Sequence, residues 1–557
     1  MISSANGVRR ILFGVSGFVL AGVALAWWLA GTFAGWPDPR SSYSAFYVLF
    51  ARDEFWGLIV VAAFGIGAAL FIFGKWNLRS LISTLPQRDS IIIAVLASAV
   101  FAITALGTHF VCHDYSLSAD EFMADFQARI FLSGKIFAEV PAQWIDAVRV
   151  IKPTFADYFP ATHEWKATYL PVYAAFRAIF QSVYLESFLN PSLAALTVVA
   201  LYGTARNIWP NDKQNAFVAG LLLAGSAQFL VMAMTTYSMP AHLALNTLWL
   251  WLYSASLRPR FYLAPVVGVL AIGLHQPIVH ALFATPFLIR LVLERKWRAV
   301  SIFAFIYLLG CAGWYAWRLE FSPPTAGHAA SFLRLWNPKM LVIQPMDLLL
   351  LAGWSALAAP LLAVLGFCHF WRERPIICDA ALSCLLTFGF YIFFYLDQGH
   401  GWGYRYFHGT LSCLILVAVA GWTALIGKAG EARAWNFLLV GTAASLLIAL
   451  PLRCLQAESF IRPFANASNG LHSMNAKVVG IDPRLAWYSA DLVRNDPFLE
   501  DRPVVVALVP LAPAEMAALE RAGTGQFISR DEMKQLGLAT IPREPRWADP
   551  FRLGKGP

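Results

Sequence analysis

Three carboxylates and a histidine stand close together in HDYSLSADEF, residues 113–122, directly after a long and nearly uncharged stretch. A carboxylate can take the proton of a hydroxyl nucleophile, so Asp120 is the candidate general base, with Glu121 or Asp114 in reserve. A structural explanation competes with this one, because the exposed amides and dipole of a helix start stabilise acidic residues. Both explanations hold together if Glu121 caps the helix while Asp120 points away.

A second polar stretch, DQGHGWGYRYFHG, covers residues 397–409 and is rich in glycine and aromatic residues. An arginine flanked by tyrosines can clamp a phosphate through two N–H groups, while a nearby tryptophan stacks on a sugar ring. The alternative is that the aromatic residues only anchor the chain at the membrane interface, with the histidines as hydrogen-bonding residues. The substrate-binding candidates here are Arg405, Trp402, Tyr404, His400 and His408.

Other polar residues are expected on the same side of the membrane. His275 in GLHQP and His242 in SMPAH stand at the ends of apolar runs, where a polar side chain is either functional or simply tolerated near water. THEWK contributes His163 and Lys166 as substrate-binding candidates, and Lys152 and Arg177 are further cations for a phosphate. His113, Asp114 and Asp120 are the candidate ligands of a divalent ion, although they form no dense ligand motif.

The composition indicates what must position these residues. The chain has 557 residues, of which 58% are hydrophobic and only 13% are charged. Apolar runs long enough to cross a bilayer as helices recur along it. The net charge of +9 does not indicate nucleic acid, because Lys and Arg collect in short loops between the apolar runs. That placement is typical of the cytoplasmic loops of a multi-pass membrane protein.

About thirteen transmembrane helices are predicted, and the run from Ile11 to Phe33 is too long for a cleaved signal peptide. If the N-terminus is cytoplasmic, every even-numbered connection carries the basic residues, so HDYSLSADEF faces the outside. The predicted spans are 11–33, 55–74, 90–111, 187–206, 214–234, 240–257, 261–276, 278–294, 298–317, 343–368, 376–396, 409–426 and 435–452.

The first large outer loop, residues 112–186, is predicted to hold two amphipathic helices lying in the membrane interface. The first begins at the N-cap Ser118, with Glu121 as its capping-box partner, and stops at Gly134; the second begins at Ala167. Residues 454–557 are predicted to form a small soluble α/β domain, also outside. The expected division is therefore 1–89 as two accessory helices, 90–453 as the catalytic membrane domain and 454–557 as the C-terminal domain.

The stretch DEFMADFQARIFLSGKIFAEVP resembles the first-outer-loop signature of the GT-C membrane glycosyltransferases, in particular the branch of the protein O-mannosyltransferases and the lipid A aminoarabinose transferase. An apolar span ends, an Asp-Glu pair opens an interfacial helix, and an alanine, a small-residue stop and a proline follow. THEWKATYLP at 162–171 is similar to a later segment of the same superfamily. Unlike the family pattern, the acidic loop follows the third span rather than the first. The matching residues are Asp120, Glu121, Ala128, Gly134 and Pro141.

The resemblance implies an all-α polytopic enzyme that transfers a hexosyl or pentosyl group from a polyprenyl-phosphate donor to a glycolipid, glycan or protein acceptor. It implies no required cofactor, although some branches use a divalent ion. It also implies a bacterial inner membrane, with the active site facing the periplasm. Two other functions stay open: a polymerase or ligase of lipid-linked glycans using Arg405, His400 and His408, and a transporter or flippase. No nucleic-acid partner is expected.

Overall fold

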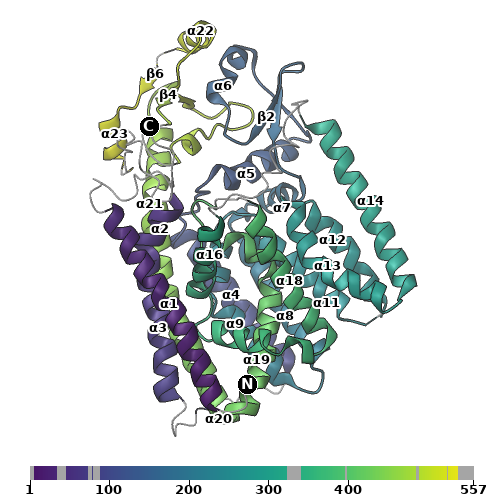
Figure 1. Cartoon of the computed structure of the whole chain (residues 1–557). Helices are drawn as coiled ribbons and strands as arrows, with labels where there is room; N and C mark the ends of the chain where they lie inside the picture. Colours follow the sequence, from purple (N-terminus) through teal and green to yellow (C-terminus); the bar gives the residue numbers. More distant parts are fainter. Residues whose placement is uncertain are drawn as a thin grey trace.

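The structure is a computed structural model that describes residues 5–33, 45–72, 78, 88–256, 258–322, 340–394, 398–483, 488–523, 525–536 and 538. Two of the basic residues used to predict the topology, Lys75 and Arg79, lie outside this part. The chain forms a bundle of helices with a mixed α/β layer at one end (Figure 1). Helices suit an apolar sequence in lipid because they satisfy every backbone hydrogen bond within one segment.

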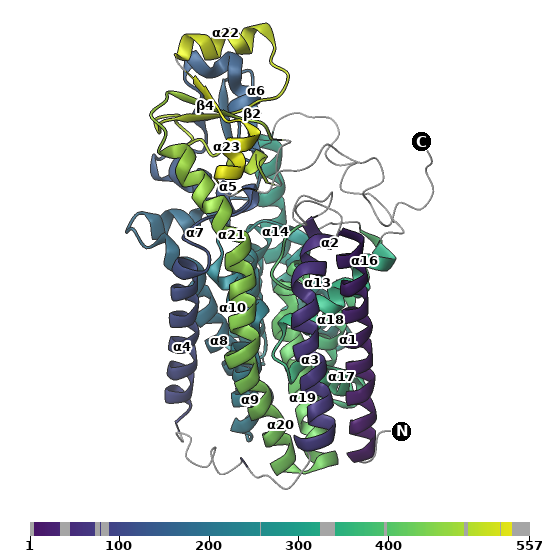
Figure 2. The ribbon, with the colours of Figure 1, turned by 90° about the vertical axis from the view of Figure 1, so that its left-hand side faces the viewer.

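Most helices of the bundle lie side by side along roughly one direction in Figure 2, below the α/β layer. Short π and 3-10 segments join or extend them, namely η2 (Phe50–Glu54), η3 (Ala68–Ile72), η7 (Pro259–Leu263), η9 (Arg405–Thr410) and η10 (Ser445–Ala449). The helices are α1 (Ala5–Phe33), α2 (Ala45–Leu49), α3 (Phe55–Gly67), α4 (Asp89–Phe110), α8 (Leu189–Ile208), α9 (Lys213–Ala224), α10 (Ala227–Met234), α11 (Met239–Tyr253), α12 (Ala264–Ile272), α13 (Pro277–Leu293), α14 (Trp297–Phe321), α16 (Met340–Trp354), α17 (Ala359–Phe367), α18 (Pro375–Phe393), α19 (Leu411–Ala429), α20 (Glu431–Ala444) and α21 (Leu450–His472).

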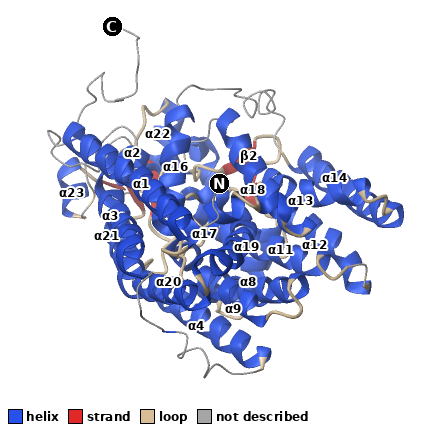
Figure 3. Cartoon of the chain, turned by 60° about the horizontal axis from the view of Figure 1, so that its bottom comes forward, coloured by secondary structure: helices blue, strands red, loops and turns tan. Residues whose placement is uncertain are grey.

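Among the described residues, eight helical stretches are long and apolar enough to cross a membrane, and a ninth is added if α9 and α10 count as one span bent by 56°. The protein is therefore a multi-pass membrane protein. The more exact count of about thirteen stays a prediction, because the remaining predicted spans correspond to shorter helices. Long α14 lies at the edge of the bundle (Figure 3), and only 11% of its most apolar stretch is buried.

Very close helix packing holds the centre of the bundle together. A Cβ added at Gly421 of α19 would lie 1.8 Å from the Leu362 carbonyl oxygen of α17, and one at Gly366 would lie 2.0 Å from the Val417 oxygen. Small residues at facing positions are what let membrane helices approach so closely. This contact fixes α19, whose N-terminal end carries the 397–409 stretch.

A buried ion pair fastens the N-terminal helices to this bundle. Arg453 of α21 is fully buried and donates two hydrogen bonds to the Glu54 carboxylate, at 3.1 and 2.7 Å. Trp354 of α16 donates to the same carboxylate at 2.8 Å, and the Arg453 guanidinium lies 4.4 Å above its ring. Gly57 leaves room for the arginine, since a Cβ there would lie 2.0 Å from Arg453 Nη2.

The outer loop carries the predicted first helix and an unpredicted sheet. α5 (Ala119–Leu132) has the expected capping box of Ser118 and Glu121, and Gly134 follows it with a φ of +76°. The second helix, α7 (Val172–Gln181), begins later than predicted, because Ala167 belongs to a strand. The loop between them forms β1 (Ala138–Glu139), η5 (Ala142–Ala147), α6 (Val148–Ile151), β2 (Ala156–Phe159) and β3 (Glu164–Ala167), with the antiparallel order β1-β3-β2, and η6 (Glu186–Phe188) leads into α8.

A continuous helical segment joins the C-terminal part to the bundle. α20, η10 and α21 are consecutive, so the predicted boundary falls inside α21, which rises from the bundle into the C-terminal layer (Figure 2). Its other elements are β4 (Val478–Ile481), η11 (Ala490–Leu492), β5 (Val504–Ala507), α22 (Pro513–Ala522), β6 (Gly525–Phe527) and α23 (Arg530–Gln535), with the parallel sheet order β5-β4-β6.

The outer loop and the C-terminal part share one hydrophobic core. Phe126 and Trp165 of the loop pack in the same buried cluster as Val478, Val504 and Ala518. The Trp165 indole also donates to the Pro497 carbonyl at 2.7 Å. The two segments, far apart in the sequence, therefore form one layer over the end of the bundle.

Candidate active site

The start of α5 separates the two adjacent carboxylates. Glu121 is buried and accepts hydrogen bonds from the Ser118 backbone N–H (2.9 Å) and hydroxyl (3.1 Å). Its other oxygen accepts from the Thr236 N–H at 3.2 Å. Asp120, one residue earlier, points to another side of the helix and keeps 22% of its side chain exposed. Glu121 is thus a capping residue in this structure, and Asp120 is the carboxylate left to face a substrate.

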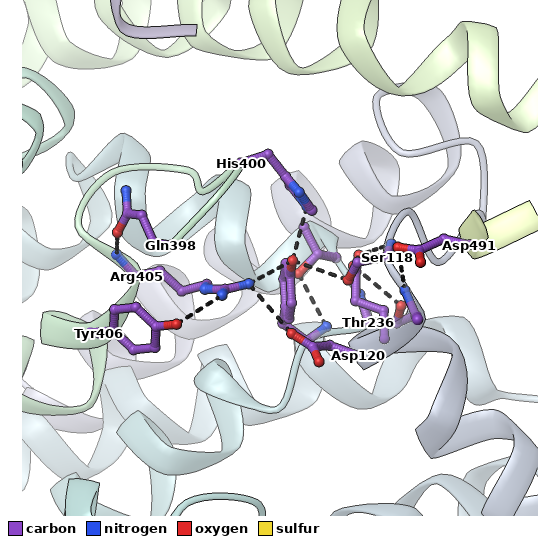
Figure 4. A network of polar contacts seen from close by, with 12 residues as sticks. Ser118, Asp120, Thr236, Gln398, His400, Arg405, Tyr406 and Asp491 are labelled. Carbon is purple, nitrogen blue, oxygen red and sulfur yellow. Dashed lines mark hydrogen bonds and ion pairs between the residues drawn. The ribbon is translucent and has the colours of Figure 1, made fainter. Parts of the chain in front are cut away.

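Asp120 has one neutral and one cationic neighbour. The Tyr169 hydroxyl donates a short hydrogen bond to Oδ1, and Oδ2 lies 3.7 Å from Arg405 Nη1 (Figure 4). Burial and the adjacent carboxylate together raise the pKa of Tyr169, so the phenol stays protonated and remains a donor. The first outer loop and the 397–409 stretch therefore meet at this carboxylate.

Two glutamine side chains hold the backbone around Arg405. Gln398 accepts from the Arg405 N–H and donates to the Gly403 carbonyl, both at 3.0 Å. Gln228 of α10 accepts from the Tyr404 N–H (3.0 Å) and donates to its carbonyl (2.9 Å). Gly403 has a φ of +85°, and a Cβ there would lie 2.4 Å from the Gln228 Oε1 atom. Glycine is therefore required at this turn for both its conformation and its size.

The Arg405 side chain is buried between two tyrosines. Its Nη1 donates to the Tyr237 hydroxyl at 2.8 Å and its Nη2 to the Tyr406 hydroxyl at 3.2 Å. The guanidinium carbon lies 5.0 and 5.2 Å from the two ring centres, which is the range of a cation–π contact. Nε is buried with no hydrogen-bond partner among the described residues. The guanidinium thus keeps donors for an anionic ligand.

The Tyr237 hydroxyl links both halves of the site. It receives the Arg405 bond and also bonds His400 Nε2 at 2.9 Å and Ser118 Oγ at 3.1 Å. Ser118 is the N-cap of the helix that carries Asp120. One phenol therefore connects the helix start, the arginine and the histidine in the network that Figure 4 shows.

A small cavity of about 20 Å³ lies beside Asp120, lined also by Gln127, Tyr169, Ser238 and His275. That volume holds about one water molecule. The His275 ring is 4.0 Å from the Tyr169 ring, centre to centre. Of the histidines predicted at helix ends, His275 is the one that lines this cavity.

Glu121 has an unusual protonation equilibrium for a carboxyl group. Burial raises the pKa of Glu121 to about 7, against a partial lowering by its hydrogen bonds and Arg494. A buried carboxyl group prefers its neutral form because the charged form loses its hydration. Since it bonds Ser118 and Thr236, its protonation state bears on the start of α5.

The other predicted residues of the 397–409 stretch mainly support its loop. Trp402 is buried beside Trp354 and Phe460, so it does not line the Asp120 cavity as a sugar platform would. The Tyr404 hydroxyl donates to Gln344 at 3.1 Å. His408 is fully buried, and its ring nitrogens have no hydrogen-bond partner among the described residues.

The predicted cations of the outer loop are engaged elsewhere. Arg177 is paired with Asp125, and Lys166, which is buried, lies 3.8 Å from Asp157 on the neighbouring strand. Lys152 donates to the Ala156 carbonyl at 2.5 Å. His163 sits at the β2–β3 turn with a φ of +58° and bonds the Tyr158 hydroxyl at 2.9 Å. Arg405 is the predicted phosphate-binding cation that the structure brings to Asp120.

The structure does not bring the predicted metal ligands together. His113 bonds Glu458 at 3.4 Å, Asp114 bonds His109 at 2.7 Å, and Asp120 has the partners already described. Within the described ranges, no group of three or more His, Cys, Asp or Glu side chains is arranged to hold a metal ion. Positive φ values at His113 and Asp114 turn the chain sharply before α5 begins.

Several residues of the site were not predicted individually. Tyr169 lies within the THEWKATYLP segment and Tyr406 beside Arg405, so a motif pointed to each. No local sequence pattern marks Tyr237, Gln228 or Asp491, because only the fold brings these residues to the site. They are joined to it through 2.8 to 3.0 Å hydrogen bonds to Arg405, Tyr404 and Ala119, respectively.

Comparison with known proteins gives structural neighbours. No family model and no curated protein matches the chain. The chain is similar to ArnT from Cupriavidus metallidurans crystallised with undecaprenyl phosphate, with 12% identity, a TM-score of 0.49, and coverage of 81% of this chain and 91% of that one. The apo form of ArnT gives 13% identity, a TM-score of 0.48 and coverage of 80% and 90%.

A second kind of neighbour is the oligosaccharyltransferase of Archaeoglobus fulgidus, crystallised with zinc and sulfate. It is 13% identical, with a TM-score of 0.38 and coverage of 71% of this chain and 61% of that one. These likenesses concern the fold. The function of this chain is therefore inferred from the residues of its own site.

Proposed function

We propose that this protein is a membrane glycosyltransferase that moves a sugar from a polyprenyl-phosphate-linked donor to a hydroxyl-bearing acceptor. The observation that carries the proposal is the pairing of Asp120 with Arg405, a proton acceptor and an anion-binding group 3.7 Å apart at one end of an apolar bundle. The first-outer-loop resemblance supplies the donor class. The acceptor is a glycolipid, a glycan or a protein.

Asp120 acts as the general base in this proposal. The acceptor oxygen attacks the anomeric carbon of the sugar, its O–H proton passes to Asp120, and the bond between that carbon and the phosphate oxygen breaks. The products are the glycosylated acceptor and the polyprenyl phosphate, which carries away the bonding electron pair. Tyr169, as a donor to Oδ1, orients the carboxylate so that the other oxygen meets the acceptor.

Arg405 stabilises the leaving phosphate. The phosphate gains negative charge as the bond breaks, and a buried guanidinium with unused donors binds that charge more strongly in the transition state than in the ground state. Phosphate binding also draws Arg405 away from Asp120. The carboxylate then loses its cationic neighbour, which favours proton transfer to it at the moment of reaction.

The side of the membrane follows from the distribution of basic residues. The connections predicted to be cytoplasmic carry Lys and Arg, so the Asp120 end of the bundle is the outer end. In a bacterium this is the periplasmic face of the inner membrane. A lipid-anchored donor and a water-borne acceptor can meet there, because α5 and α7 lie where the bundle ends (Figure 2).

The decisive experiment measures sugar transfer from the membrane lipid pool in cells that carry wild type, Asp120→Asn or Arg405→Ala. Glu139→Gln is the matched control, since this carboxylate is in the same outer loop but exposed. Expression and monodispersity in detergent verify folding. We expect Asp120→Asn to fold normally, to lower transfer by about 10² to 10⁴ and to leave the lipid-linked donor to accumulate.

A different outcome would favour a different function. If Asp120→Asn transfers as well as wild type while Arg405→Ala is inactive, Asp120 is only part of the helix start. That outcome favours the alternative function, a polymerase or ligase in which Arg405 and His400 act on a lipid-linked glycan. If neither variant affects any transfer but export of a lipid-linked sugar changes, the protein is a transporter or flippase.

A further inference from the structure

Residues 488–494 of the C-terminal part, called here the clamp segment, touch both halves of the candidate site. We infer that the clamp segment is a positioning element of the active site, which sets the relation between the Asp120 helix and the Arg405 loop. This inference rests on the proposed function for its kinetic consequences. The contacts that it describes can be tested without a sugar-transfer assay.

Asp491 holds the start of the Asp120 helix. Its Oδ2 accepts a hydrogen bond from the Ala119 backbone N–H at 3.0 Å, directly beside Asp120 (Figure 4). Its Oδ1 accepts from the Thr154 hydroxyl at 3.4 Å. The backbone N–H groups of the first helical turn have no carbonyl partner within the helix and need other acceptors. Ser118 and Glu121 provide acceptors from the same turn. Asp491 adds one from a segment far away in the sequence.

Arg494 fixes the residues just before that helix. Its Nη2 donates to the Leu117 carbonyl at 2.9 Å and its Nε to the Asp491 carbonyl at 2.7 Å. The guanidinium carbon lies 4.2 Å from the Tyr115 ring centre and 5.4 Å from that of Phe122. Arg494 thus contacts the chain on both sides of Ser118 and also holds Asp491 in place.

Tyr488 holds the other half of the site. Its hydroxyl accepts a hydrogen bond from the His400 backbone N–H at 3.0 Å, and its ring packs edge-on against the His400 ring, 4.9 Å between centres. His400 in turn bonds the Tyr237 hydroxyl that receives the Arg405 bond. A displacement of Tyr488 is therefore passed to the arginine through three hydrogen bonds.

Residues that follow the clamp segment in the chain anchor it to the outer loop. Arg149 and Glu515 form a two-bond ion pair at 2.6 Å, which lowers the pKa of Glu515, and Asn495 donates to the Ile151 carbonyl at 2.7 Å. The shared hydrophobic core described above lies beneath these contacts. The segment therefore has a rigid base from which to position the site, as a positioning element needs.

Asp491 also contributes to the electric field at Asp120. The titratable and charged groups that act on or contact Asp120 come from several elements: Tyr169, His275, Arg405, Tyr237 and Asp491. Asp491 is the carboxylate among these groups, and burial together with the nearby Asp120 raises the pKa of Asp491.

The test compares Asp491→Ala, which removes the acceptor, with Asp491→Asn, which keeps an acceptor oxygen but removes the charge. Tyr488→Phe removes the bond to His400, and Glu500→Gln is the control in the same part of the chain. Hydrogen exchange of the full-length protein in detergent is followed at residues 119–122 and 399–405. Sugar transfer from the membrane lipid pool is measured in parallel.

We expect Asp491→Ala to speed exchange at the start of α5 and Tyr488→Phe to speed it in the Arg405 loop, each with a fall in kcat of about tenfold. Asp491→Asn restores slow exchange and most of kcat. A residue that only supports folding would lower the amount of folded protein while leaving kcat per folded molecule unchanged.

Two results would overturn the inference: unchanged exchange in Asp491→Ala and Tyr488→Phe, or faster exchange with kcat the same as wild type. Failure of the proposed function looks different. In that case the exchange changes occur as expected, but even wild type transfers no sugar and Asp120→Asn alters nothing.

Discussion

Asp120 Oδ2 lies 3.7 Å from Arg405 Nη1, although one residue opens the first outer helix and the other precedes α19 near the end of the bundle. Separate local structures position the two residues. A capped helix start holds Asp120, and a glycine turn supported by two glutamine side chains holds Arg405. Their meeting places a carboxylate and a guanidinium within reach of one ligand. The predictions below test what each contact around this pair contributes.

Replacing Arg405 by lysine keeps the positive charge but loses the planar, multi-donor geometry. We expect Arg405→Lys to lower kcat/KM by about 10², because an ammonium cannot replace the bonds to Tyr237 and Tyr406 and also bind phosphate through two donors. Steady-state transfer from a purified polyprenyl-phosphate sugar measures the effect. A Lys variant as active as wild type would show that only charge is needed there.

Tyr169→Phe removes the hydrogen bond to Asp120 Oδ1 while keeping the ring against His275. The bond orients the carboxylate, so its loss leaves Asp120 less well placed to take the acceptor's proton. We expect kcat to fall by about tenfold. If kcat is unchanged, Tyr169 only fills space in the cavity.

The buried Glu121 gives stability a pH dependence. Burial raises the pKa of Glu121 from 4.5 to about 7 in the folded protein. The folded state therefore holds this proton more tightly than the unfolded state. The contribution is fully present below pH 4.5 and is lost as pH rises through about 7, on the order of 3 kcal/mol in all.

Thermal melts of wild type and Glu121→Gln in detergent, from pH 5 to pH 8, measure this difference. We expect the wild-type Tm to fall relative to that of the variant as pH rises, since glutamine does not titrate. The Gln side chain also replaces one acceptor with a donor, so the comparison uses the slope with pH and not the absolute Tm. Parallel slopes would mean that Glu121 stays in one protonation state over this range.

Breaking the Glu54–Arg453 pair should loosen the N-terminal helices from the bundle. Glu54→Gln leaves a fully buried arginine without a counter-ion, which typically costs about 3 to 5 kcal/mol. We expect a marked fall in Tm for this variant. The double variant Glu54→Gln/Arg453→Met should recover part of that loss, because no buried charge remains; a double variant worse than either single one contradicts this account.

Local patterns predicted much of the fold. Apolar runs found the principal helices, and Ser118, Glu121 and Gly134 marked the limits of α5, because a helix start and stop depend on neighbouring residues. The sheet β1-β3-β2 was missed, since its strands are only two to four residues long and are made by pairing within the loop. The predicted spans 240–257 and 261–276 are longer than α11 and α12, whereas the predicted span 278–294 agrees with α13 in length.

The site was predicted in part for the same reason. Asp120 and Arg405 stand out because each interrupts an apolar sequence with charge. Lys166 and Arg177 stand out equally, but the fold gives each a carboxylate partner, so charge alone did not distinguish ligand-binding cations from paired ones. Tyr237 and Asp491 act through contacts between distant segments, and such contacts leave no mark on a single sequence.

The shared core of the outer loop and the C-terminal part has a consequence for biosynthesis. Trp165 and Phe126 leave the ribosome early, whereas Val478, Val504 and Ala518 follow only after the membrane helices have been made. Part of the apolar surface of the outer loop therefore stays uncovered until the C-terminal part has been synthesised. A chain that stops before residue 488 cannot form the contacts of Tyr488 and Asp491 with the candidate site.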